Sequence, residues 1–271
     1  MGTYNIDLVE YARFYQIKVY AEPISGEKKE HEEILVPREA PPGWGPVERV
    51  TYELSEEEKD RVRKHSVVSS VNRTKNTIYE YAHSNSWDWF VTFTFKRDTS
   101  LDVYDFNSVM KTMRIWLHKQ KSKCCDLKYL LIPEKHKDGA WHFHGLLANT
   151  EGLHFVDSGK KFKGRNSYNL VEYKKGFSVC EKVTDTGKIS NYVLKYITKD
   201  LITDTEGKTR FIVSRGLNLA EHHKKLYSET EMQMYGNELM ELFQNGQILY
   251  KKDFEIPCTN NNVVTYFVKK E

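Results

Sequence analysis

Apolar and polar positions in the middle of the chain repeat first with the period of a strand and then with that of a helix. Residues 89–95 are a run of aromatic and β-branched residues, which predicts a buried strand. The following segment predicts an amphipathic helix, because its apolar residues recur every three or four positions. These residues are Phe106, Val109, Met110, Met113 and Leu117.

Extended and helical segments continue to alternate after this helix. Because several connections have the length of a hairpin, the pattern predicts an α+β fold with a central antiparallel sheet of about five strands flanked by helices. The helices are expected at 188–201 and at 229–245, where Gly246 ends the second one. The further strands are expected at 127–133, 141–147, 177–183 and 210–213.

The N-terminal part of the chain has a different character. Ser55 and Glu58 form a capping box that opens a polar helix, and a second helical stretch covers about 74–82. Four of the seven prolines lie between positions 37 and 46, where neither a helix nor a central strand can form. We therefore expect an N-terminal extension with a Pro/Gly-rich linker at 1–50, a main domain at 51–220, and a C-terminal helix and strand extension at 221–271.

Composition indicates whether the chain is globular, membrane-spanning or rich in disulfides. A chain of 271 residues, 39% of them hydrophobic, can bury a substantial core. No apolar run has the length of about 20 residues that crosses a bilayer, and the N-terminus carries no apolar leader, so we expect a cytoplasmic protein with no membrane partner. The four cysteines have no C-x-x-C spacing, which argues against a zinc knuckle and against a disulfide framework.

Charge is unevenly distributed, although the net value is only +3. Between positions 160 and 199, ten basic residues stand against three acidic ones. Such a stretch is either a solvated, lysine-rich surface or a contact for nucleic acid, and charge alone does not decide between the two.

Two histidines are the first candidates for residues of a functional site. Side chains alternate between the faces of a strand, so His142 and His144 point to the same face while Phe143 enters the opposite layer. Two imidazoles on one face can bind the same metal ion.

The hairpin before the histidines decides which residue lies opposite them. A two-residue loop of Asp138 and Gly139 would pair Lys135 with His142. A three-residue loop with a left-handed Gly139 pairs Glu134 with His142 instead, and this register builds a site of two histidines and one carboxylate. His136 shares the face of Glu134 but lies nearer the turn, so it is the second choice for the third ligand.

Such a set fills three positions of an octahedral ion and leaves the others for water and phosphate oxygens. It suits Mg²⁺ or Mn²⁺ that polarises a phosphodiester. Zinc is chemically possible as well, and the sequence does not select among these ions.

Two tyrosines follow on the helix predicted at 188–201. Tyr192 and Tyr196 are four residues apart and so share one helix face, and Lys195 and Lys199 form a second such pair beside them. A neighbouring ammonium or a metal-bound phosphate favours the phenolate that attacks phosphorus. The same pattern also fits a helix that packs its tyrosines in a core and leaves its lysines in water.

Taken in order, three motifs resemble those of the HUH endonuclease superfamily, specifically the rolling-circle replication initiators of small phages and plasmids. The resemblance covers about 66–218 and implies that the domain at 51–220 is an HUH nuclease with a ferredoxin- or RRM-like fold. No Walker A pattern occurs, so a fused helicase is not expected. The motifs are Phe90–Phe95 as the first strand, His142-Phe143-His144 as the His-hydrophobic-His motif, and Tyr192-x-x-Lys195-Tyr196-x-x-Lys199 as a two-tyrosine nucleophile helix.

The resemblance implies an enzyme that nicks and joins single-stranded DNA at a specific site, and thereby initiates rolling-circle replication in a bacterial host cell. A tyrosine would attack the scissile phosphate, giving a 5′-phosphotyrosine and a free 3′-OH. Tyr196 is preferred as the first nucleophile. The family roles fall on His142, His144 and Glu134 as metal ligands, on Tyr196 and Tyr192 as nucleophiles, and on Lys199 and Lys195 as groups that stabilise charge.

The implied partners are single-stranded or hairpin origin DNA and the helicase and polymerase of the host. A basic stretch interleaved with aromatic residues can hold a single strand by neutralising phosphates and stacking bases. The candidates for DNA binding are Lys160, Lys161, Lys163, Arg165, Lys174, Lys175 and Arg215.

Three alternatives to this function stay open. A single-strand transposase with the same chemistry would join two transposon ends. A non-catalytic origin-binding protein of the same fold would shift hairpin DNA without cutting it. A metal-dependent phosphoesterase with incidental tyrosines would hydrolyse small phosphodiesters without becoming attached to them.

Overall fold

A computed structural model describes residues 2–25, 55–97, 100–162, 164–256 and 261–270. The chain divides into two compact units. One unit is formed by residues 64–220, and the other combines residues 1–63 with residues 221–271. The prolines at 37–46 lie outside the described residues.

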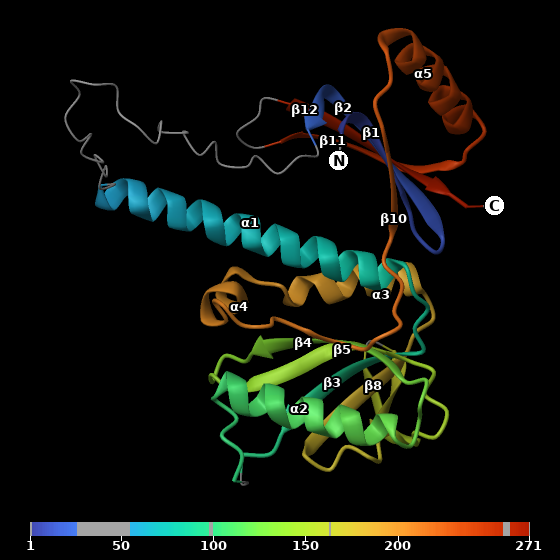
Figure 1. Ribbon diagram of the computed structural model, residues 1–271. Coiled ribbons are helices and arrows are strands. Elements are labelled where there is room, and N and C mark those ends of the chain that lie inside the picture. The colour runs from blue at the N-terminus through green and yellow to red at the C-terminus, as the bar shows by residue number, and fades with distance from the viewer. Residues whose placement is uncertain (1, 26–54, 98–99, 163, 257–260, 271) are drawn as a thin grey trace, which may run out of the picture. The chain divides into compact units, whose positions relative to one another are not determined.

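The unit at 64–220 is built on a seven-stranded sheet with the order β6-β7-β8-β3-β5-β4-β9. Figure 1 labels its central strands β8, β3, β5 and β4. All neighbouring strands in the sheet run antiparallel. The α+β class and the antiparallel sheet are thus confirmed. The strands are β3 Trp89–Phe95, β4 Lys128–Lys135, β5 Trp141–Ala148, β6 Phe155–Phe162, β7 Arg165–Leu170, β8 Gly176–Lys182 and β9 Ile212–Val213.

The sheet is larger than the expected five strands because the β6–β7 hairpin adds two at one edge. This hairpin is rich in lysine, serine and glycine. An edge hairpin buries few side chains, so it lacks the alternation of apolar and polar residues by which strands are recognised in a sequence.

Helix α2, Phe106–Lys121, covers one face of this sheet (Figure 1). Asp105 caps its N-terminus by accepting hydrogen bonds from the backbone N–H groups of Asn107 and Ser108. All five apolar residues of the predicted stripe are buried, which confirms that helix. Its Trp116 packs edge-on against Phe93 of β3, a residue with no exposed surface.

The N-terminal helical region differs from the expectation of two separate stretches. A single helix, α1, runs over Glu56–His83. The capping box at its start is present: the Glu58 N–H bonds to Ser55 Oγ, and the Ser55 N–H bonds to the Glu58 carboxylate. The region between the two expected stretches is helical despite its polar character, since neither proline nor glycine interrupts it.

The expectation of one helix over 188–201 is wrong. Helix α3 covers Thr186–Val193, a 3₁₀ turn covers Leu194–Tyr196, and α4 begins only at Lys199 and ends at Asp204. Ile197 breaks the helix with an extended backbone at φ −89° and ψ 90°, and its side chain is buried. Thr198 then caps α4 by accepting from the N–H of Leu201.

The second unit contains a five-stranded antiparallel sheet with the order β10-β1-β2-β12-β11. The two ends of the chain were expected as separate extensions, whereas their strands pair with each other, for instance Val19 with Val264. Periodicity carries no information on pairing between strands so far apart in the chain. Its elements are β1 Thr3–Glu10, β2 Phe14–Ser25, β10 Glu221–Lys225, α5 Glu229–Gln244, β11 Ile248–Ile256 and β12 Asn261–Lys269.

Helix α5 matches the expected C-terminal helix. Gly246 follows it with a positive φ of 68°, the conformation typical of a glycine that ends a helix. Leu239 of α5 packs with Ile6, Ile17 and Val268 in the core of this unit. Within the described ranges, no helix is both long enough and apolar enough to cross a membrane.

The close packing of β4 against β5 predicts that Gly145→Ala destabilises the unit at 64–220. A Cβ at this position would lie 2.0 Å from the carbonyl oxygen of Leu130 and 2.8 Å from the Cα of Leu131. We expect a loss of about 3 kcal/mol, seen as a fall of roughly 5–10 °C in the thermal midpoint of that unit.

Gly187→Ala is the control, because its added Cβ would meet no atom closer than 3.4 Å. Differential scanning calorimetry of the two variants makes the comparison. Equal midpoints for both would contradict the packing described for β4 and β5.

Candidate nuclease site

The β4–β5 hairpin has the register that places a carboxylate opposite the histidines. Glu134 pairs with His142, and the N–H of His136 bonds to the carbonyl of Ala140 at 2.8 Å. Gly139 has a positive φ of 89°, and its N–H bonds to the carbonyl of His136. The three-residue loop is therefore confirmed, and the two-residue loop that would have paired Lys135 with His142 is excluded.

Strand β3 holds both imidazole rings from the other side. Thr94 Oγ1 lies 3.0 Å from His142 Nδ1, and Thr92 Oγ1 lies 3.0 Å from His144 Nδ1. In a tautomer that binds metal through Nε2, each Nδ1–H donates to its threonine, and such contacts fix ring orientation and basicity. These threonines are not among the residues predicted for the site, although their alternation in Phe90–Phe95 already assigns both to one face.

Glu134 and His144 are in direct contact. Glu134 Oε2 lies 2.9 Å from His144 Nε2, and the side chain of His144 is mostly buried. The hydrogen bond with His144 is the main cause that lowers the pKa of Glu134, and the charges of His144, Lys195 and His142 act in the same direction. The carboxylate is thus held in its charged form, the form in which a carboxylate can bind a cation.

His142 is held in its neutral form. Burial lowers the pKa of His142 to about 4, and the neighbouring His136 and His144 act in the same direction. The rings of His136 and His142 stack with centroids 5.0 Å apart. A neutral imidazole is the form that binds a metal ion.

The donor set of Glu134, His142 and His144 fits a divalent cation in its chemistry and in its supporting threonines. The ligand atoms of all three residues do not yet lie within 4.8 Å of one another; among the described residues, only Glu10, Glu221 and His223 meet that spacing. His142 and His144 are two residues apart on one strand, a Cα separation of roughly 6.8 Å. Their rings therefore have to turn toward a shared ion.

The tyrosines lie over this set. The ring of Tyr196 stacks on that of His144, with centroids 3.9 Å apart and planes 4° from parallel. Tyr192 stands edge-on to Tyr196 at 5.8 Å. Burial raises the pKa of Tyr196, and the hydrogen bond with Tyr192 raises it further. The break at Ile197 sets the position of Tyr196, which closes the 3₁₀ turn.

Lys195 contacts both tyrosines. Its Nζ lies 3.6 Å from the ring centroid of Tyr192 and 4.6 Å from that of Tyr196, and it donates a hydrogen bond to Tyr192 Oη. Its charge also contributes to the lowered pKa of Glu134. Lys199, by contrast, is an exposed residue that opens α4 beyond the extended Ile197.

A pocket of about 200 Å³ adjoins Tyr192. Phe90 contributes to its apolar lining, and Arg165, Lys182 and Lys188 supply positive charge. Of these basic residues, only Arg165 is among those predicted to bind DNA. The signal for the other two was the excess of basic residues between 160 and 199, which did not indicate which of them lie near the tyrosines.

The other candidates for DNA binding are spread around the sheet. Lys160 and Lys161 are exposed on β6, and Lys174 and Lys175 are exposed in the connection between β7 and β8. Arg215 follows β9 at the opposite edge of the sheet, and it is exposed as well. Lys163 lies outside the described residues.

Residues 88–201 match the family model of replication-associated protein ORF2/G2P. This segment is similar to replication-associated proteins. It runs from just before β3 into α4 and so contains both histidines, Glu134 and both tyrosines. No curated protein and no solved structure matches the chain significantly. The ORF2/G2P match supports a role in replication for this unit.

The surroundings of His142 predict an unusually acidic imidazole in protein freed of metal by a chelator. Because burial and two neighbouring imidazoles oppose protonation, its resonance is expected to titrate with a midpoint near pH 4. Heteronuclear NMR with a His142→Gln variant for assignment measures this. A midpoint near the ordinary value of 6.5 would contradict the geometry described here.

Proposed function

We propose that this chain is a metal-dependent DNA endonuclease with a tyrosine nucleophile, which nicks and joins single-stranded DNA at a replication origin. The observation that carries the proposal is the stacking of Tyr196 on His144, with ring centroids 3.9 Å apart. It brings a phenol next to an imidazole and carboxylate set suited to a divalent cation. The ORF2/G2P match over 88–201 supports replication as the setting.

Glu134, His142 and His144 are the proposed ligands of Mg²⁺ or Mn²⁺. The cation, when bound, would polarise the scissile phosphate and offset the charge that develops on it. Thr92 and Thr94 would accept from Nδ1–H of the two imidazoles and so leave each Nε2 for the cation. His136, whose ring stacks on His142, stays the second choice for the third ligand.

Tyr192 is proposed to attack first. Lys195 donates to Tyr192 Oη, so its ammonium stabilises negative charge on that oxygen, whereas burial raises the pKa of Tyr196. This reverses the preference for Tyr196 in the sequence analysis. The Tyr192 oxygen bonds to phosphorus, the P–O3′ bond breaks, and the phenolic proton passes through solvent to the departing 3′-oxygen. The products are a 5′-phosphotyrosine and a 3′-OH that a host polymerase can extend.

Tyr196 would serve the joining reaction. While the first DNA end stays attached to Tyr192, Tyr196 attacks the regenerated origin and releases a new 3′-OH. That hydroxyl then attacks the first phosphotyrosine, which frees Tyr192 and joins the strand. Each step exchanges one phosphate ester for another, so no bond energy is lost to hydrolysis.

The DNA strand is proposed to cross the sheet face that carries the histidines. Phe177 and Val179 of β8 pair with Thr94 and Thr92, so they share this face, and Phe177 is 67% exposed. An exposed aromatic ring offers a stacking platform for a base. Arg165, which lines the pocket beside Tyr192, would neutralise a neighbouring phosphate.

The tyrosine pair is tested by a covalent adduct. The protein is incubated with Mn²⁺ and a labelled single-stranded oligonucleotide from its own replicon, then denatured. We expect Tyr192→Phe to slow adduct formation more than Tyr196→Phe, because only Tyr192 receives the Lys195 hydrogen bond. The double variant forms no adduct, whereas Tyr104→Phe, a change at an exposed tyrosine, reacts like the wild type.

Removal of the cation tests the ligand set in the same assay. Chelation or His144→Ala is expected to slow adduct formation by on the order of 100-fold, since the stabilisation of phosphate charge is lost. An adduct that persists in the double tyrosine variant would reject the mechanism. DNA binding without any cutting by the wild type would favour the non-catalytic origin-binding alternative.

The proposed DNA path predicts a specific role for Arg165. Arg165→Ala should weaken binding of the single-stranded oligonucleotide. It should also reduce the slope of log affinity against log salt concentration by about one, because one phosphate contact is lost. Arg114→Ala is the control, because Arg114 is exposed on α2 across the sheet. Fluorescence anisotropy at several salt concentrations measures both variants, and an equal effect in the two would contradict the path.

A further inference from the structure

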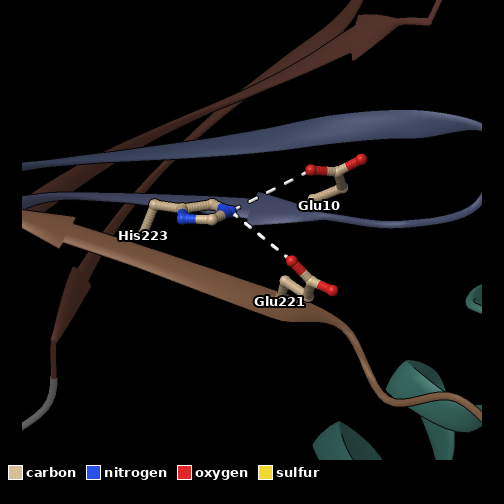
Figure 2. A group of neighbouring side chains, drawn as sticks. All are labelled: Glu10, Glu221 and His223. Carbon is tan, nitrogen blue, oxygen red and sulfur yellow. Dashed lines mark ion pairs between the residues drawn. The ribbon is translucent and has the colours of Figure 1, made fainter.

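Three side chains with metal-binding atoms meet on the five-stranded sheet, in the other unit of the chain. Glu10 of β1 pairs directly with Glu221 of β10, and His223 lies two residues along β10 on the same face. Figure 2 shows the imidazole of His223 pointing toward both carboxylates. No local pattern in the sequence indicates this cluster, because it depends on pairing between the two ends of the chain.

The distances are close to those of ligands around one ion. His223 Nε2 lies 3.9 Å from Glu10 Oε2 and 4.0 Å from Glu221 Oε2, and all three ligand atoms lie within 4.8 Å of one another. Ligands at about 2.1 Å from a tetrahedral zinc ion are about 3.4 Å apart. Closing the two distances from His223 by roughly half an ångström, and bringing the two carboxylate oxygens to the same spacing, would complete the geometry, and exposed side chains achieve this by rotation.

The electrostatics of the cluster favour a cation. Carboxylates directly opposite each other on neighbouring strands repel, and a divalent ion between Glu10 and Glu221 would turn that repulsion into attraction. Lys270 already pairs with Glu10 through Oε1. The other oxygen of Glu10, Oε2, faces His223, so Lys270 orients this carboxylate and leaves one oxygen for a metal.

We propose that Glu10, Glu221 and His223 form a second metal site, which binds Zn²⁺ with water in the fourth position. One imidazole and two carboxylates, with water in the fourth position of a tetrahedron, form a ligand set that zinc commonly takes. The site cross-links β10 to β1. All five residues of β10 are exposed, so this edge strand gains little from burial, and a metal clip stabilises its pairing.

Titration of Zn²⁺ alone into the full-length chain tests this site by isothermal calorimetry. The His142→Ala/His144→Ala background removes the proposed catalytic ligands, so that its result does not depend on the nuclease proposal. We expect one equivalent of Zn²⁺ to bind and to raise the thermal midpoint of the unit that contains β1 and β10. Adding His223→Ala or Glu221→Gln should weaken this binding at least tenfold.

His222→Gln is the matched control. His222 neighbours His223 but contacts Asp7 through Nδ1 at 3.1 Å, and glutamine keeps a donor for that carboxylate. This variant is expected to bind Zn²⁺ like its parent. Circular dichroism confirms that each variant is folded, and Glu221→Gln, at an exposed position, provides a mild change should His223→Ala fail to fold. Absence of binding in the background protein, or binding unchanged by both ligand substitutions, would overturn the proposal.

Discussion

A glycine with positive φ at the β4–β5 turn sets the register on which the site depends. Gly139 allows a three-residue loop, and Glu134 then stands opposite His142. A slip of one residue would turn Glu134 to the far face and bring Lys135 opposite the histidines, where its charge would repel a cation. Strand β3 reinforces the register from the other side, since Thr92 reaches one imidazole and Thr94 the other.

The second constraint is the interruption of the helix that carries the tyrosines. In a continuous helix Tyr192 and Tyr196 would simply share a face. The 3₁₀ turn and the extended Ile197 instead close this segment over β5, where Tyr196 stacks on His144 and Lys195 contacts both tyrosines. Phenol, imidazole and carboxylate thus lie close together, although the chain between Glu134 and Tyr192 first forms most of the sheet.

Local signals in the sequence were enough for much of this arrangement. The β4–β5 hairpin, its register and the buried stripe of α2 follow from turn chemistry and periodicity, which act over a few residues. The edge hairpin β6–β7 was not predicted, because its polar side chains bury little surface and so show no apolar alternation. The break at Ile197 depends on the burial of that side chain in the tertiary core, and the pairing of β2 with β12 joins strands from opposite ends of the chain. Neither of these leaves a local pattern.

Locating Mn²⁺ in a crystal of the wild-type protein tests most directly whether one cation binds two imidazoles and a carboxylate beside a phenol. We expect an anomalous peak at bonding distance from Glu134, His142 and His144. A tyrosine oxygen should lie close enough to this peak for one phosphate group to bridge the two. Full occupancy of Mn²⁺ elsewhere with none at this position, under conditions that support cleavage, would contradict the proposed chemistry.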